Sequence, residues 1–137
     1  MTNRMSAFNL LIQTPDREIY QGPADLLTLS TDTGEMQVLP GHVSMLGSIT
    51  YSAVRLQNKD HHEDYVLRQG FLFVEQETND VRVLGMTIQK TEELDEVSAK
   101  EYLEFILAKL DKPEELNKYQ LTFLEGQKIA LEKQLET

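Results

Sequence analysis

Residues 34–46 read Gly-Glu-Met-Gln-Val-Leu-Pro-Gly-His-Val-Ser-Met-Leu. Between residues 35 and 39 the side chains alternate, as they do in a strand with one buried face. Pro40 and Gly41 then interrupt the strand, because proline donates no sheet hydrogen bond and glycine readily enters turns. On the other side, the sequence Thr-Asp-Thr-Gly at 31–34 is typical of a turn. This stretch therefore predicts a short strand between two turns.

The same pattern extends outward over about the first 85 residues. Further strand candidates, separated by turn signals, are residues 7–13, 17–21, 25–31, 51–57, 64–68, 70–75 and 81–85. Residues 58–60 and 78–80 are the expected hairpin loops. Short strands at this spacing, without a helical period between them, predict an antiparallel β-sandwich or flattened barrel.

The pattern changes near Glu92. From Glu96 to Leu110 apolar residues recur every three or four positions, which predicts a helix. Pro113 ends it and is tolerated in the first turn of a second helix, expected from about residue 114 to 134. Asp111 and Glu114 have the spacing of a capping box. The expected buried stripe of the second helix is Leu116, Tyr119, Phe123, Ala130 and Gln134, widened by Leu124, Leu131 and Leu135.

A two-residue connection makes the two helices antiparallel neighbours. Gly126, within the second helix, marks either a close helix–helix crossing or a bend. The predicted fold is mainly β plus α: an antiparallel β-sandwich over residues 1–88, followed by an antiparallel two-helix hairpin over residues 89–137. A two-helix unit cannot bury both of its faces by itself, so the hairpin is a candidate mobile element.

The composition excludes several classes of function. The 137 residues carry a formal net charge of −10, which disfavours binding to nucleic acid and to anionic lipid. There is no cysteine, so disulfides and thiolate chemistry are excluded. No run approaches the ~20 apolar residues of a membrane helix, and the first residues do not resemble a signal peptide, so we expect neither membrane insertion nor export.

The sequence contains no convincing active site. His61 and His62 lie beside Asp60, Glu63 and Asp64, but adjacent strand residues point to opposite faces, so this cluster is interpreted as a solvated hairpin loop. His42 follows a Pro-Gly turn and is interpreted as structural. The carboxylates near the first helix suit the positive end of its dipole; they are Glu92, Glu93, Asp95 and Glu96. A small hydrolase or metal enzyme that uses His42, His61 and nearby carboxylates is the remaining catalytic alternative.

Residues 34–46 closely resemble the Pro-Gly-His segment of ATP synthase epsilon subunits. Other pieces follow in that family's order: residues 8–16 resemble its first hairpin, 70–74 its Gly-rich strand, 81–84 its last strand and 94–99 the opening of its helical hairpin. The resemblance covers essentially the whole chain. It implies a non-catalytic rotor subunit in the central stalk of an F-type ATP synthase. Because no cofactor or metal motif is present, we expect neither a cofactor nor a metal.

The resemblance also implies partners. The sandwich would bind the gamma subunit and the c ring, and the hairpin could contact the catalytic alpha/beta head. By position, Glu35 would face the c ring, and Pro40, Gly41, His42 and Met45 would lie near gamma. Alternatively, Glu35 is a solvated turn residue and Gly41-His42 only shapes a turn. The implied location is the cytoplasmic face of a bacterial inner membrane, with the stromal side of a plastid thylakoid as the alternative.

The hairpin departs from the family pattern. Many members regulate ATP hydrolysis through basic hairpin side chains, and some hold ATP through an Asp and an Arg of the first helix. This chain keeps Asp95 and Ala99 but has Ser98 in place of that arginine, and no arginine follows Arg82. We therefore expect weak or absent ATP binding, and a hairpin that is non-inhibitory or inhibits through apolar contacts. A stand-alone interaction or sensor module outside the synthase is the alternative function.

Overall fold

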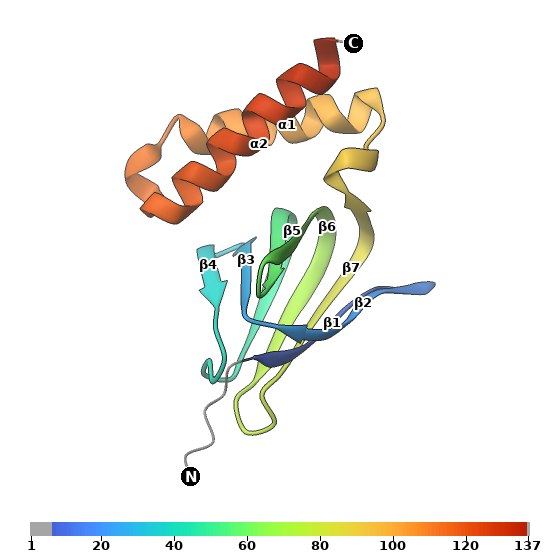
Figure 1. The fold of residues 1–137 in the computed structure, drawn as a ribbon, viewed down its shortest axis with the longest axis vertical. Helices are drawn as coiled ribbons and strands as arrows, with labels where there is room; N and C mark the ends of the chain where they lie inside the picture. The colour runs from blue at the N-terminus through green and yellow to red at the C-terminus, as the bar shows by residue number, and fades with distance from the viewer. Residues whose placement is uncertain (1–6, 137) are drawn as a thin grey trace. The chain divides into compact units, whose positions relative to one another are not determined.

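The computed structural model describes residues 7–136 (Figure 1). The chain divides into two compact units, of which the first ends at Lys90 and the second begins at Thr91. The last strand continues to Lys90, so the first unit extends beyond residue 88.

The first unit is one seven-stranded sheet with the order β2-β1-β7-β6-β5-β3-β4. Its strands are β1 (Phe8–Thr14), β2 (Arg17–Ala24), β3 (Leu26–Thr31), β4 (Gly34–Val38), β5 (Met45–Asn58), β6 (His61–Glu75) and β7 (Asp80–Lys90). Neighbouring strands are antiparallel except β1 and β7, which are parallel. One cluster of buried apolar side chains draws on all seven strands, so the sheet folds over to enclose a single core. The predicted sandwich is confirmed.

Several strands are longer than predicted. β2 runs to Ala24 rather than to residue 21, and β7 runs to Lys90 rather than to residue 85. Residues 64–68 and 70–75 belong to one strand, β6, which pairs with β5 in the same register on both sides of Gln69. Gln69 has a left-handed φ of 53°, a local irregularity that does not end the strand. In addition, β5 begins at Met45 rather than at residue 51, because Gly47 and the polar residues after it continue the ladder.

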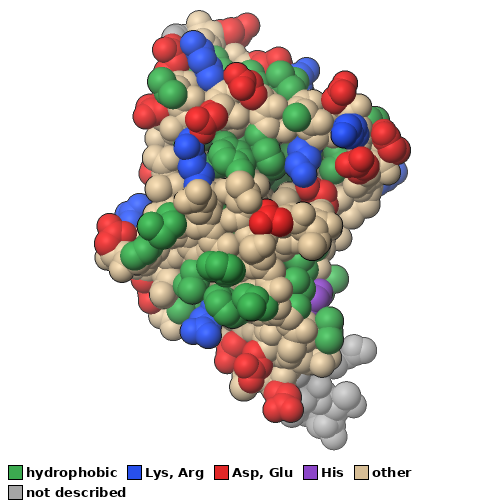
Figure 2. All heavy atoms as spheres, turned by 180° about the vertical axis from the view of Figure 1, so that it is seen from behind, with side chains coloured by type: hydrophobic (Ala, Val, Ile, Leu, Met, Phe, Trp, Pro, Cys, Tyr) green, Lys and Arg blue, Asp and Glu red, His purple; other side chains and the backbone are tan. Residues whose placement is uncertain are grey.

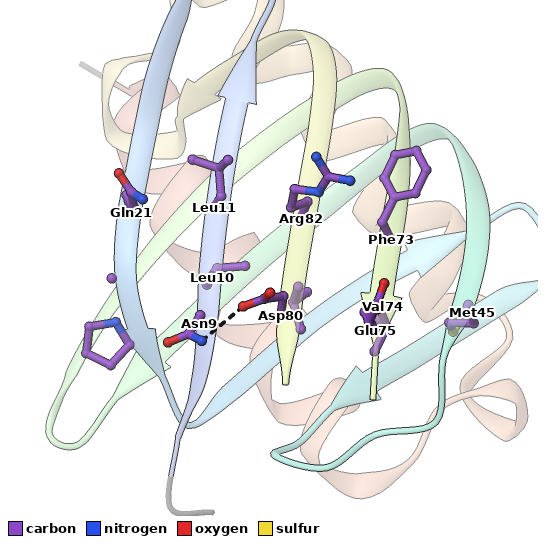
Figure 3. A pocket seen from close by; sticks show the side chains of 13 residues that line it. Asn9, Leu10, Leu11, Gln21, Met45, Phe73, Val74, Glu75, Asp80 and Arg82 are labelled. Carbon is purple, nitrogen blue, oxygen red and sulfur yellow. Dashed lines mark hydrogen bonds between the residues drawn. The ribbon is translucent and has the colours of Figure 1, made fainter. Parts of the chain in front are cut away.

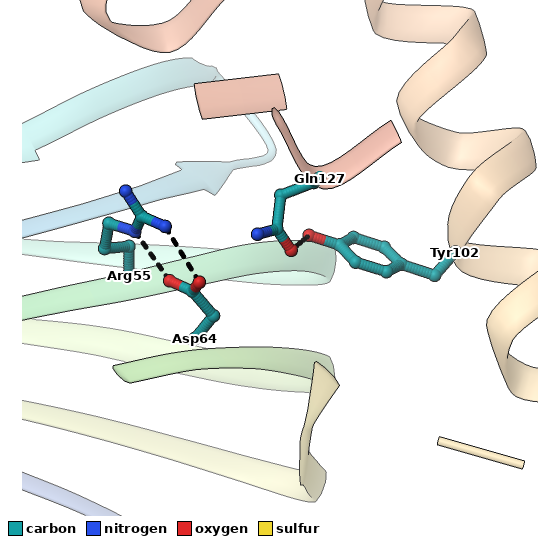
Figure 4. Close-up of polar contacts among 4 residues, drawn as sticks. All are labelled: Arg55, Asp64, Tyr102 and Gln127. Carbon is teal, nitrogen blue, oxygen red and sulfur yellow. Dashed lines mark hydrogen bonds and ion pairs between the residues drawn. The ribbon is translucent and has the colours of Figure 1, made fainter. Parts of the chain in front are cut away.

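The second unit contains α1 (Glu96–Leu110) and α2 (Lys118–Glu136), preceded by the 3₁₀ turns Thr91–Glu93 and Pro113–Glu115 respectively. Tyr102 on α1 donates a hydrogen bond of 3.0 Å to Gln127 on α2 (Figure 4), and Gln134 donates one of 3.3 Å to the Leu94 carbonyl. These pairings run in opposite directions along the chain, so the helices form the predicted antiparallel hairpin.

The start of the second helix was predicted wrongly. Pro113 opens only a short 3₁₀ turn, which ends because Leu116 adopts an extended conformation. The capping box lies further on: Asn117 Oδ1 accepts a 2.8 Å hydrogen bond from the Gln120 amide, and Gln120 Oε1 accepts a 3.0 Å bond from the Asn117 amide. The Asp111–Glu114 box and the two-residue connection are therefore both incorrect.

The buried face of α2 also differs in part from the predicted stripe. Its buried residues are Gln120, Phe123, Leu124 and Leu131, whereas Ala130 and Gln134 are exposed. A Cβ placed on Gly126 would meet nothing within 4 Å, which contradicts a close helix–helix crossing there. Within residues 7–136 no helix combines the length and the hydrophobicity needed to cross a bilayer.

Candidate interaction surface

The Pro-Gly-His sequence lies in the 39–44 loop, which joins β4 to β5. The turn is closed by a 3.1 Å hydrogen bond from the His42 amide to the Leu39 carbonyl. Gly41 has a φ of 81°, a conformation that glycine adopts without steric strain. His42 Nδ1 lies 2.8 Å from the Val43 carbonyl; because a carbonyl only accepts, this nitrogen carries the proton. The histidine contact is thus local to the loop.

A second loop, residues 76–79 between β6 and β7, holds the first one in place. Asn79 Oδ1 accepts a 3.0 Å hydrogen bond from the Gly41 amide, and Gln76 Nε2 donates a 3.0 Å bond to the Gly41 carbonyl. The backbone amide of Gln76 donates a 2.8 Å hydrogen bond to Ser44 Oγ. Both backbone groups of Gly41 are therefore held by side chains of the 76–79 loop, a role that the sequence did not reveal.

Glu35 lies near the start of β4, whereas the 39–44 loop follows the end of that strand, so the length of β4 separates the two. Its carboxylate accepts a 2.6 Å hydrogen bond from Ser30 Oγ. The adjoining turn is tied to β5 through Asp32, which accepts hydrogen bonds from Ser48 Oγ at 2.8 Å and from the Thr50 amide at 2.9 Å. The hydrogen bond from Ser48, followed by hydrogen bonding from Thr50, lowers the pKa of Asp32.

Of the residues proposed from the sequence, the structure groups Pro40, Gly41 and His42 in one loop. Met45 follows at the start of β5, where it is partly buried against the core. Glu35 belongs to a separate hairpin at the other end of β4, so the five residues lie at two separate places rather than at one.

The histidine-rich segment is not a loop. The β5–β6 turn is confined to Lys59 and Asp60, and β6 begins at His61. His61 Nε2 lies 2.9 Å from Glu63 Oε2, and the Tyr65 hydroxyl donates to Glu63 Oε1. The hydrogen bond to His61, followed by that to Tyr65, lowers the pKa of Glu63, while burial raises the pKa of Tyr65.

The next carboxylate in the sequence, that of Asp64, has a different partner. Asp64 forms a bidentate ion pair with Arg55, with distances of 2.6 and 2.9 Å (Figure 4). Among residues 7–136 no three His, Cys, Asp or Glu side chains are grouped so as to hold a metal ion. Nothing in this geometry supports a hydrolase or metal enzyme built on His42 and His61.

The outward side of the sheet carries apolar residues where solvent-facing positions are expected. Leu46 is 64% exposed and Phe71 is 49% exposed. They alternate with core residues on β5 and β6, and their cross-strand neighbours Phe73 and Leu84 are also apolar. We call these four residues the outer apolar face. Figure 2 shows hydrophobic side chains gathered on one face of the sandwich domain.

One cross-strand row joins Leu11, Arg82, Phe73 and Leu46 on β1, β7, β6 and β5. The Arg82 guanidinium lies 5.4 Å from the centroid of the Phe73 ring, within the range of a cation–π contact. Leu11, Phe73 and Arg82 also line a groove of about 690 Å³, with Met45 at its far side (Figure 3). The row therefore combines apolar area with a cation and a concave surface.

In the hairpin, Asp95 is the N-cap of α1, and its carboxylate accepts a 2.7 Å hydrogen bond from the Ser98 amide. Ala99 is fully buried. The carboxylate at the degenerate ATP motif thus caps the helix.

The β-sandwich model of the ATP synthase delta/epsilon chain matches residues 7–90, more than half of the sequence. The chain belongs to the ATP synthase delta/epsilon family. An ATP synthase epsilon chain of Bacillus cytotoxicus is 34% identical over 97 residues, which is 71% of this chain and 71% of the relative. One of Bacillus thuringiensis is 34% identical over 91 residues, which is 66% and 67% of the respective chains.

Two solved assemblies contain chains with the same fold. A chain of the Euglena gracilis mitochondrial ATP synthase (OSCP/F1/c-ring) superposes with a TM-score of 0.63 at 24% identity, covering 90% of this chain and 76% of that one. A chain of the Tetrahymena thermophila mitochondrial ATP synthase (central stalk/c-ring) gives 0.55 at 14% identity, covering 70% and 85%. The family expected from the sequence is confirmed. An epsilon chain is a non-catalytic subunit of ATP synthase, so this chain is not itself an enzyme.

Proposed function

We propose that this epsilon chain is a rotor subunit in the central stalk of an F-type ATP synthase, where its sandwich domain binds the gamma subunit and the c ring and so couples ion-driven rotation to ATP synthesis. The observation that carries the proposal is the outer apolar face. Its exposed Leu46 follows the 39–44 loop closely in the chain, and its Phe73 lies beside the exposed Arg82 in the sheet.

The outer apolar face suits a stable protein contact. Exposed apolar side chains grouped on one surface mark interaction sites, and interfaces are enriched in aromatic residues and arginine. Phe71 and Phe73, with ring centroids 6.3 Å apart, and Arg82 supply this composition. We assign this face, with Pro40, Gly41, His42 and Met45 beside it, to gamma.

The Glu35 hairpin suits a different contact. Its turn is polar, with Thr31, Asp32 and Thr33 around Glu35, and the Asp32 hydrogen bonds to β5 hold it rigid. A rigid polar turn favours a small contact rich in hydrogen bonds, as expected against the polar loops of a c ring. We assign Glu35 to that contact.

We assign the hairpin neither a nucleotide-binding role nor an inhibitory role. From residue 88 onward the chain has 7 Lys against 12 Asp and Glu, a net charge of −5, and no Arg. A triphosphate needs fixed cationic donors, and an acidic partner would repel this segment.

The bacterial epsilon relatives favour a position at the cytoplasmic face of a bacterial inner membrane.

The test is a titration of the purified full chain against an ATP synthase head-plus-gamma preparation stripped of its own epsilon chain. The control is the same head without gamma. One-to-one binding that requires gamma supports the proposal. No binding, where a Bacillus epsilon chain binds, favours instead a stand-alone interaction or sensor module, which predicts a monomer without affinity for gamma.

A further inference from the structure

The 76–79 loop does more than connect β6 to β7. Besides holding Gly41, Asn79 Nδ2 donates a 2.8 Å hydrogen bond to the Ala7 carbonyl, and the Asn79 carbonyl accepts a 2.9 Å bond from the Asn9 amide. One partly buried amide side chain therefore joins the 39–44 loop to the entry of the first strand.

We propose that Asn79 is a positioning residue that holds the 39–44 loop in the shape that the gamma subunit binds. The inference rests on the proposed function, since it takes gamma as the partner of that loop. The loop follows β4, an edge strand, and its exposed Leu39 and Val43 leave it little packing of its own. Its conformation is instead set by hydrogen bonds from the 76–79 loop, which remove the entropy loss of ordering it on binding.

The chemistry of the site selects asparagine. Asn79 has a φ of 58°, a left-handed conformation that asparagine and glycine tolerate better than other residues. Its side-chain amide accepts a hydrogen bond from the backbone amide of Gly41 and donates one to the Ala7 carbonyl. Aspartate can accept but not donate, and glycine keeps the backbone conformation but offers neither group. These two substitutions therefore separate the three roles of Asn79, which are its left-handed backbone conformation, its hydrogen-bond acceptor and its hydrogen-bond donor.

The experiment compares the full chain with the variants Asn79→Gly and Asn79→Asp. Amide exchange of Gly41, followed by NMR, reports the loop contact, and affinity for the epsilon-stripped head-plus-gamma preparation reports its consequence. Lys59→Gly is the matched control, because Lys59 also has a positive φ, of 59°, but lies in the β5–β6 turn.

In Asn79→Gly the Gly41 amide should exchange faster and affinity should fall about tenfold, the order expected when preorganising hydrogen bonds are lost. In Asn79→Asp, which keeps the acceptor, Gly41 should stay protected and affinity should remain within about twofold of the parent chain, although thermal stability falls. Lys59→Gly should change neither quantity.

Two results would overturn the inference while leaving the proposed function intact. One is unchanged affinity in Asn79→Gly despite faster Gly41 exchange, which would mean that gamma does not need the loop to be held. The other is an equal loss of affinity in both variants with Gly41 still protected in Asn79→Asp, which would assign the effect to Ala7 and the strand. Failure of the parent chain to bind would overturn the proposed function itself, and the inference with it.

Discussion

Replacing Leu46 with threonine should weaken binding to gamma much more than it weakens the fold. Leu46 is 64% exposed in the free chain. Complete burial of a leucine stabilises by about 1.5–3 kcal/mol, so covering the exposed part at an interface contributes about 1.5 kcal/mol, or roughly tenfold in affinity. The part already covered accounts for less than about 1 kcal/mol of folding stability. Threonine keeps the strand preference at this position.

The assay is a titration of parent chain and variant against the epsilon-stripped head-plus-gamma preparation, with urea unfolding of each free chain. Ile129→Thr is the matched control: Ile129 is 66% exposed but belongs to α2 in the hairpin. It should bind like the parent chain. Equal affinities for Leu46→Thr and the parent chain, or an equal loss in both variants, would refute the assignment of the outer apolar face to gamma.

Three further predictions concern the rest of the chain. Gly126→Ala should raise the free energy of unfolding by about 1 kcal/mol in urea titrations, because a Cβ there meets open space; a lower stability would refute this. Asp32→Asn should destabilise the chain at pH 7 but not near pH 2. The hydrogen bond from Ser48 lowers the pKa of Asp32 in the folded chain. The carboxylate therefore contributes to folding stability above the unfolded carboxyl pKa, and this contribution is lost as pH falls through the folded pKa. A stability difference between the two chains that persists undiminished at pH 2 would refute this. Removing the hairpin after Lys90 should leave ATP hydrolysis by the reconstituted complex unchanged, and the full chain should show no saturable ATP binding; a rate increase on truncation or a saturable isotherm would contradict the hairpin assignment.

The elements of this fold were predictable where one local signal decided them. The period of α1 fixed both of its ends at Glu96 and Leu110. The start of α2 was not predictable in the same way, because two segments could form a capping box. Asp111 and Glu114 have the right spacing, but Pro113 directs the chain into a 3₁₀ turn, and Asn117 forms the box instead.

The interaction surface could be predicted only in part. The Pro-Gly-His loop is visible as a motif, whereas its support by Asn79 depends on two loops that are distant in sequence. The outer apolar face did leave a signal: Phe71 to Val74 is apolar at every position, although a strand with one solvated face should alternate. Their partners Leu46 and Leu84 follow only from the strand register.

The central claim, that the outer apolar face is covered by gamma, can be tested directly because the chain has no cysteine. A single Leu46→Cys substitution provides one thiol on that face, and Ile129→Cys provides a reference thiol on the hairpin. The measurement is the rate of thiol labelling in the free chain and in the chain bound to the head-plus-gamma preparation. The account predicts that binding slows labelling at Leu46 strongly and leaves labelling at Ile129 unchanged. Equal labelling of Leu46 in the free and the fully bound chain would contradict it.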